Sequence, residues 1–102
     1  MNYAKVGLIS ETYSKDEFGI DVVTETKKEI FAKVESISAR EFYSAGQNDI
    51  KPEFRMIVNV DEYGGEKILT YSGQRYSIYR TYQNLENSLE LYVERKAGTN
   101  ED

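Results

Sequence analysis

The sequence contains 102 residues with a formal net charge of −5, and it has no cysteine and no histidine. This length fits a single domain with a modest core, and the missing residue types exclude disulfides, thiolate metal sites and histidine-based catalysis. The acidic charge argues against tight sequence-independent binding to nucleic acid. No apolar run is long enough for a signal peptide or a membrane span, so we expect a soluble intracellular protein.

The N-terminal half carries the weaker patterns. Residues 5–13 and residues 18–26 (FGIDVVTET) are predicted strands. Residues 15–17 are expected to turn between these two strands.

Residues 27–43 fit two different structures. Their apolar residues recur at helical spacing, and Thr26 with Glu29 matches the capping box that begins a helix. Read as a strand, the segment alternates well until Ile37 falls out of phase and requires a bulge. The β-rich remainder of the chain favours the long, bulged strand.

In the next segment the apolar residues show no helical or strand periodicity, and it contains the only proline of the chain. Glycine, asparagine, aspartate and proline form turns and break strands, and the proline also biases the residue before it toward an extended backbone. We therefore predict a long loop between two strands, and loops of this length without internal structure are commonly functional or mobile. The predicted loop consists of Ser44, Ala45, Gly46, Gln47, Asn48, Asp49, Ile50, Lys51, Pro52 and Glu53.

The C-terminal half shows the period-2 alternation of half-buried strands. The predicted strands cover residues 54–63, 66–72, 75–83 and 88–94, with turns at Gly64-Gly65, Ser72-Gly73 and residues 84–87. In the last strand, apolar Leu89, Leu91 and Val93 alternate with Glu90, Tyr92 and Glu94 on the opposite face. Short strands joined by tight turns predict a mainly β protein, a small antiparallel barrel or sandwich with one long loop and room for a short helix.

Candidate catalytic and metal-binding groups do not converge in the sequence. The carboxylates are scattered at turns and on strand faces opposite the apolar residues, where solvated charge belongs. The pairs Asp16–Glu17 and Asp61–Glu62 lack the ligand spacing of a calcium loop, and no glycine-rich phosphate loop is present. We therefore predict no enzymatic activity, no cofactor and no metal site.

The segment QRYSIYRTYQ supports an alternative function. Arg75 and Arg80 interleave with Tyr76, Tyr79 and Tyr82, and such residues on a sheet can neutralise phosphates and stack bases. The alternative is an OB-like module that binds single-stranded nucleic acid. Strand alternation divides the tyrosines between two faces, so core packing explains a good part of them.

Three segments together resemble a known family. They are EIFAKVESISAREFYSAGQNDIKPEFRMIV, GEKILTYSGQRYSIYRTY and LELYVERK. In their order and spacing they resemble the head-closure proteins of long-tailed bacteriophages, also called head–tail connector or joining proteins of the stopper type. The resemblance covers residues 1–96 and implies one β-barrel connector domain there, followed by a flexible polar tail at residues 97–102.

The resemblance implies a structural role in the virion. Members of the family are small β-barrels that form a ring beneath the portal and its adaptor, close the DNA channel after packaging and present a docking surface for the tail. By resemblance, residues 44–53 are the loop that projects into the channel. We expect a monomer in isolation and a homo-oligomeric ring in the particle. The expected neighbours are the portal or adaptor protein on the head side and a tail-completion protein on the tail side.

The same resemblance predicts where the protein is found and how it meets DNA. It would lie in the neck of the virion, and in the bacterial cytoplasm during assembly, without contact with a membrane. Packaged double-stranded DNA would pass through the ring without sequence-specific binding. A net charge of −5 is compatible with DNA sliding through a channel, because an acidic wall avoids strong attachment to phosphates.

Overall fold

Six antiparallel strands close into a barrel in the order β1-β2-β3-β6-β5-β4. The computed structural model describes the backbone of residues 2–100 and the side chains of residues 2–95. The elements are β1 (Asn2–Lys15), β2 (Asp21–Ser36), α1 (Ala39–Gly46), β3 (Pro52–Asn59), the 3-10 helix η1 (Val60–Glu62), β4 (Ile68–Tyr71), β5 (Gln74–Leu85) and β6 (Ser88–Asn100). The predicted fold class, a mainly β barrel with a short helix, is confirmed. No helix within residues 2–100 is long and apolar enough to cross a membrane.

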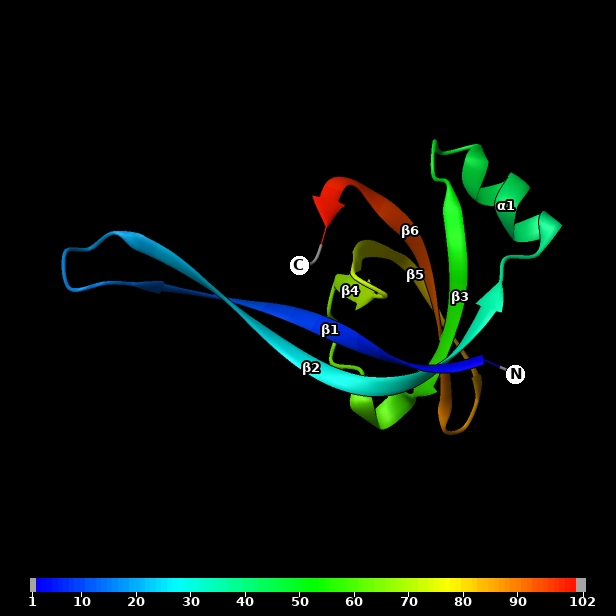
Figure 1. Cartoon of the computed structure of the whole chain (residues 1–102), viewed down its shortest axis with the longest axis horizontal. Helices are drawn as coiled ribbons and strands as arrows, with labels where there is room; N and C mark the ends of the chain where they lie inside the picture. The colour runs from blue at the N-terminus through cyan, green and yellow to red at the C-terminus, as the bar shows by residue number, and fades with distance from the viewer. Residues whose placement is uncertain (1, 101–102) are drawn as a thin grey trace.

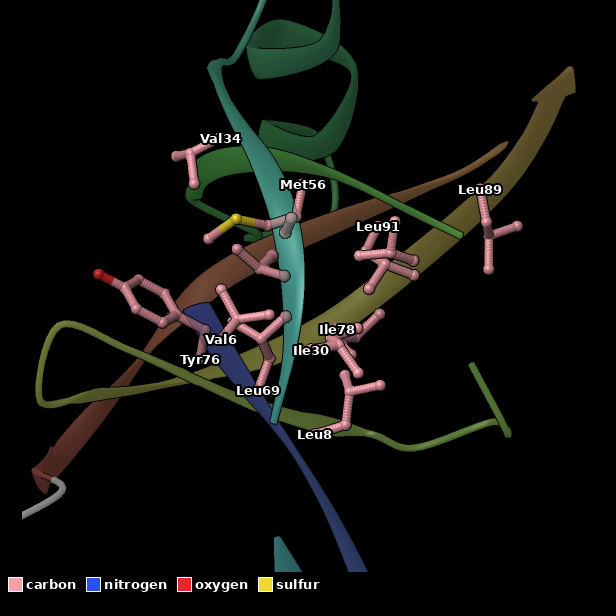
Figure 2. Close-up of a cluster of buried hydrophobic side chains, with 13 residues drawn as sticks. Val6, Leu8, Ile30, Val34, Met56, Leu69, Tyr76, Ile78, Leu89 and Leu91 are labelled. Carbon is pink, nitrogen blue, oxygen red and sulfur yellow. The ribbon is translucent and has the colours of Figure 1, made fainter. Parts of the chain in front are cut away.

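The inward-facing side chains of all six strands fill the barrel. Figure 2 shows this cluster, in which Leu8, Met56, Leu69, Leu91 and Val93 are fully buried. The period-2 alternation that predicted β3 and β6 is confirmed, because the residues it assigned to the apolar face point into this core. Each such side chain contributes about 1.5–3 kcal/mol by leaving water.

Residues 27–43 are divided between a strand and a helix. β2 continues as far as Ser36, so the strand prediction is right for its first part. It is wrong for the remainder, because α1 begins at Ala39 and no bulge is needed at Ile37. The capping-box match at Thr26 and Glu29 lies inside β2, where pairing with β1 determines the structure.

One predicted hairpin is confirmed and another is wrong. Tyr71 pairs with Gln74 across Ser72-Gly73, whose φ angles of 52° and 77° are those of a two-residue hairpin turn. Gly64-Gly65 does not join two paired strands, since β3 pairs with β2 and β6 whereas β4 pairs with β1 and β5. The chain instead crosses the end of the barrel through η1.

The end of β6 differs from the predicted tail. The strand continues to Asn100, whose backbone lies opposite Gln74, so residues 97–100 belong to the sheet. Residues 101–102, the rest of the predicted tail, lie outside the described residues.

β1 and β2 form a hairpin that is much longer than the barrel requires. Their ladder runs without a register shift from Asn2 opposite Val34 to Lys15 opposite Asp21. β1 meets β4 only over residues 7–9, and β2 meets β3 only over residues 33–36. Residues 10–26, which we call the arm, therefore project away from the barrel, and they account for much of the 51 Å long axis (Figure 1).

Candidate functional site at the helix between β2 and β3

The connection between β2 and β3 contains most of the predicted loop, but it is not a long loop. Residues 44–46 are the last part of α1, residues 47–51 form the turn that follows, and Pro52 and Glu53 begin β3. The prediction of an unstructured segment at residues 44–53 is therefore wrong at both ends. Pro52 is buried at the first position of β3, where its lack of an N–H does not interrupt the sheet.

Local hydrogen bonds explain why α1 forms and where it ends. The Ser38 side chain accepts a hydrogen bond of 3.1 Å from the backbone N–H of Glu41, which is the N-cap contact of a helix. At the other end, the N–H groups of Asn48 and Ile50 both donate to the carbonyl of Ala45, at 3.0 and 3.2 Å. Asp49 between them adopts the left-handed region, with φ 61°, which aspartate tolerates better than most residues.

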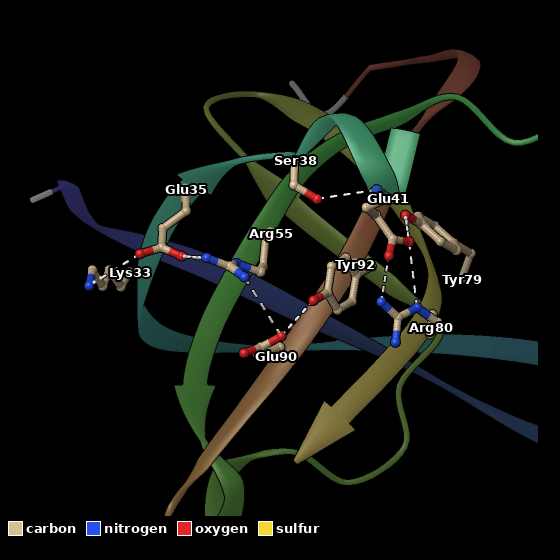
Figure 3. Close-up of polar contacts among 9 residues, drawn as sticks. All are labelled: Lys33, Glu35, Ser38, Glu41, Arg55, Tyr79, Arg80, Glu90 and Tyr92. Atoms are coloured by element: carbon tan, nitrogen blue, oxygen red, sulfur yellow. Dashed lines mark hydrogen bonds and ion pairs between the residues drawn. The ribbon is translucent and has the colours of Figure 1, made fainter. Parts of the chain in front are cut away.

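The Glu41 carboxylate binds α1 to the outer surface of β5. The Tyr79 hydroxyl donates a hydrogen bond of 2.7 Å to it, and the Arg80 guanidinium forms an ion pair of 2.5 Å with it (Figure 3). Burial of Glu41 opposes its ionisation, but the hydrogen bonds from Arg80 and Tyr79 outweigh burial and lower its pKa. Burial and the hydrogen bond to Glu41 raise the pKa of Tyr79, so this phenol stays protonated as a donor.

The contacts continue from β5 to β6. The Arg80 guanidinium carbon lies 4.0 Å from the centre of the Tyr92 ring, which is cation–π geometry. The Tyr92 hydroxyl donates a hydrogen bond of 2.5 Å to Glu90. Glu90 is only 6% exposed. The prediction that carboxylates opposite the apolar residues are solvated is thus wrong for Glu90, because neighbouring side chains cover the outside of β6.

Arg55 on β3 completes this outer-face network. It donates to Glu35 on β2 from its Nε atom at 2.9 Å, with a second contact from Nη2, and its Nη1 atom lies 4.0 Å from Glu90. Hydrogen bonds from Arg55 and then from Lys33 lower the pKa of Glu35. Figure 3 shows two groups of hydrogen bonds and ion pairs on the outer face of the barrel, one around Glu41 and one that runs from Lys33 to Tyr92. The cation–π contact between Arg80 and Tyr92 links the two groups.

The five residues of the predicted nucleic-acid surface do not form one surface. Tyr76 points into the core, Tyr79 contacts Glu41, and Tyr82 is exposed farther along β5. Arg75 forms an ion pair with Glu25, and Arg80 forms one with Glu41. Tyr79 and Arg80 share the Glu41 carboxylate, whereas Arg75, Tyr76 and Tyr82 lie elsewhere, so the five residues form no continuous basic and aromatic face.

Aromatic side chains are exposed on the free side of α1. Phe42 and Tyr43 pack edge to face, with ring centres 6.1 Å apart, and Tyr43 is 73% exposed. A cleft of about 380 Å³ lies between α1 and β5, with Arg40, Ala45 and Ile50 among its lining residues. These residues could not be singled out in the sequence while the segment was assigned to a strand and a loop.

The arm is the second feature that the sequence prediction missed. Tyr13 and Phe18 are 71% and 78% exposed, and Ile20 and Val23 are also exposed. The sequence did contain one signal for the arm. Large apolar residues directly follow the predicted turn at residues 15–17, and a turn that is exposed only to solvent does not require such residues. The length of the two strands then places these residues beyond the barrel.

Comparison of the chain with models of protein families, and with curated proteins, gives no match.

Proposed function

We propose that the chain is a structural subunit of the head–tail connector of a long-tailed bacteriophage or prophage. It forms a ring in the neck of the virion, closes the DNA channel after packaging and provides the surface on which the tail docks. Its neighbours are the portal or adaptor protein on the head side and a tail-completion protein on the tail side. The ring assembles in the cytoplasm of the bacterial host.

The observation that carries this proposal is apolar surface outside a barrel that is already closed and filled. Phe42 and Tyr43 on α1, and Tyr13 and Phe18 on the arm, are half or more exposed. Grouped apolar side chains on the surface of a small protein mark contacts with other proteins. Because α1 and the arm project from different parts of the barrel (Figure 1), one subunit offers surfaces for more than one neighbour, as a ring requires.

The resemblance assigns channel closure to the segment between two barrel strands. In this chain that segment joins β2 to β3, which are neighbours in the barrel, and it contains α1. We propose residues 37–51 as the segment that faces the channel, in place of residues 44–53. The ion pair between Glu41 and Arg80 gives this segment a defined starting position on the outer face.

The alternative, an OB-like module for single-stranded nucleic acid, has weaker support. Phosphate binding requires arginine or lysine side chains that can pair with phosphates. Arg75 and Arg80 are instead each paired with a carboxylate within the chain. The barrel also has six strands, whereas the OB-fold has five.

Interruption of the gene in a phage or prophage that encodes the chain tests the proposal. We expect heads that lose their DNA and tails that accumulate separately, with infectivity restored by the wild-type chain in trans. Genes for a portal and for tail proteins are expected to flank this gene. Normal tailed particles formed without the chain would contradict the proposal.

Complementation with variants identifies the surface that matters. Phe42→Ser combined with Tyr43→Ser should fail to restore tailed particles while leaving the barrel folded, because both side chains are exposed. Leu85→Ser is the matched control, since Leu85 is an exposed apolar residue at the far turn of β5 and belongs to neither α1 nor the arm. Equal failure of the control would show a general loss of solubility and would leave α1 without a specific role.

A further inference from the structure

We propose that the arm pairs edge to edge with the arm of a second copy of this chain, the β1 edge of one copy beside the β2 edge of the next. This inference rests on the proposed function, because a ring is what places copies of the chain side by side. It adds the interface: a continuous antiparallel sheet built from the arms of neighbouring subunits.

Both outer edges of the arm lack a strand neighbour. β1 pairs with β4 only at residues 7–9, and β2 pairs with β3 only at residues 33–36. Within the described part of the chain, the backbones of residues 12–15 and 21–24 therefore form ladder pairs only with each other, and Glu25 at the base of the arm also binds Arg75. Each edge leaves a row of backbone N–H and C=O groups open, which is a template for the strand of another chain.

These edges lack two common protections against pairing. The arm contains no proline, and its ladder has no bulge that would twist an edge away. Thr12 and Tyr13 on β1, and Val22, Val23 and Thr24 on β2, are residue types that favour strands. A partner strand would therefore meet a regular edge of strand-forming residues.

The tip of the arm is already ordered in the single chain. One carboxylate oxygen of Asp16 accepts hydrogen bonds of 2.9 Å from the N–H groups of both Phe18 and Ile20. The Asp16 backbone N–H donates to the carbonyl of Ile20 at 2.9 Å, and Gly19 provides the positive φ of 77° that the turn needs. Little conformational entropy remains to be lost when such an arm pairs, which favours association.

Copies of the chain on both sides cover both edges of the arm. In copies related by rotation about a ring axis, β2 of one arm and β1 of the next run in opposite directions, so the contact is an antiparallel pair. Each copy supplies one edge of each kind, and closure of the ring then leaves no edge open. A strand from an unrelated protein would cover one edge and leave the other exposed.

The side chains of the arm also complement those of a second arm at the same level. Lys15 and Asp21 face each other across the hairpin at 2.7 Å, and both are well exposed. Arms side by side would thus place the Lys15 of one copy next to the Asp21 of another, in a row of alternating charge. Tyr13 and Val23, which also pair across the hairpin, would meet the Val23 and Tyr13 of the neighbours on the same face.

Cysteine cross-linking tests the arrangement, because the natural chain has no cysteine. Thr12→Cys and Thr24→Cys are purified as separate proteins, mixed at millimolar concentration and oxidised gently, and the linked pairs are measured by mass spectrometry. We expect the Thr12–Thr24 heterodimer to exceed both homodimers severalfold. Each variant has a single cysteine, so no linkage can form within one chain. Val22→Cys and Thr26→Cys, on the same face, test registers shifted by two residues.

The outcomes distinguish failure of the arm contact from failure of the proposed connector function. Random pairing, dominance of the Thr12–Thr12 homodimer or absence of linkage at every register overturns the arm contact. Asn87→Cys mixed with Thr12→Cys is the control and should give only random pairing, because Asn87 lies at the turn between β5 and β6. If gene interruption gives separate heads and tails while no arms cross-link, the connector function stands and the arm interface is wrong. If the arms cross-link while the interrupted gene still gives normal particles, the arm interface stands and the connector function is wrong.

Discussion

Arg75 on β5 and Glu25 on β2 form a two-pronged ion pair, with 2.7 Å between Nη2 and Oε1 and 3.1 Å between Nη1 and Oε2. β5 and β2 are not neighbours in the barrel, so this contact bridges the strands between them. Paired hydrogen bonds from a guanidinium fix orientation as well as distance. Arg75 therefore attaches the base of the arm to β5.

Arg75→Gln should loosen the arm without unfolding the barrel. We expect the backbone order parameters of Val22 and Val23 to fall, and stability to change by about 1 kcal/mol or less, because Glu25 is partly exposed. NMR relaxation and thermal melting measure these two quantities. Lys15→Gln is the control, since it breaks an exposed ion pair at the tip and leaves the base intact. An arm as rigid as in the wild type would show that the strand ladder alone fixes its direction.

Glu41→Gln should weaken the attachment of α1 and change the dependence of stability on pH. The folded-state pKa of Glu41 lies below its ordinary value of 4.5, so its ionisation stabilises the protein above that value. This contribution is lost as the pH falls through the lowered folded-state pKa. We therefore expect the variant to be less stable at neutral pH and to lose less stability on acidification.

Melting temperature measured from neutral pH down to acidic pH tests this expectation. Glu86→Gln is a suitable control, because the Glu86 carboxylate lies at the exposed turn between β5 and β6, away from the network. Parallel pH profiles for the wild type and Glu41→Gln would mean that the contact with Arg80 does not contribute to folding. The Glu41→Gln variant should still show some acid sensitivity from Glu35, whose pKa is also lowered.

Gly7→Ala should destabilise the barrel. A Cβ atom at this position would lie 2.5 Å from Thr70 Oγ1 and 2.8 Å from Lys27 Cε, which is closer than van der Waals contact allows. We expect a loss of about 1–3 kcal/mol in urea unfolding, the usual cost of overpacking. Gly46→Ala is the matched control, because no atom lies within 4 Å of its added Cβ and alanine favours the helix. Equal stability of the two variants would show that Thr70 and Lys27 move aside freely.

The isolated protein should not bind single-stranded nucleic acid at physiological salt. Arg75 and Arg80 are held by Glu25 and Glu41, and the net charge of −5 repels phosphates. Fluorescence anisotropy with a labelled single-stranded oligonucleotide over a range of salt concentrations measures the binding. Micromolar affinity that is lost in Arg80→Ala would support the nucleic-acid function instead.

Strand positions in the C-terminal half could be predicted from the sequence, because period-2 alternation follows from burial on one side of a sheet. Met56, Val58 and Leu91 carry this signal, and all three are buried. Which strands pair could not be predicted, since the same local turn chemistry fits a hairpin and a crossing. Ser72-Gly73 forms the hairpin, whereas Gly64-Gly65 lies on a crossing set by closure of the barrel.

The candidate site depends on contacts between residues far apart in the sequence, which no local pattern reveals. Glu41 lies in the first turn of α1, after the N-cap Ser38, and its carboxylate binds Arg80 on β5. Glu90 had the alternation of an exposed residue and became buried because Arg55 and Tyr92 cover it. Sequence periodicity describes one face of one strand, whereas these outcomes depend on what the rest of the fold places against the other face.

The pairing of β1 with β4 has a consequence for folding. Only residues 7–9 and 68–70 form this seam, yet they complete the barrel, and they come from distant parts of the chain. Most other strand contacts join sequence neighbours, so they can form early, whereas the seam must wait for most of the chain to be in place. We therefore expect its closure to be a late step in folding. We also expect this seam, which spans only residues 7–9 of β1, to open more readily than the long ladder between β1 and β2, which amide hydrogen exchange would measure.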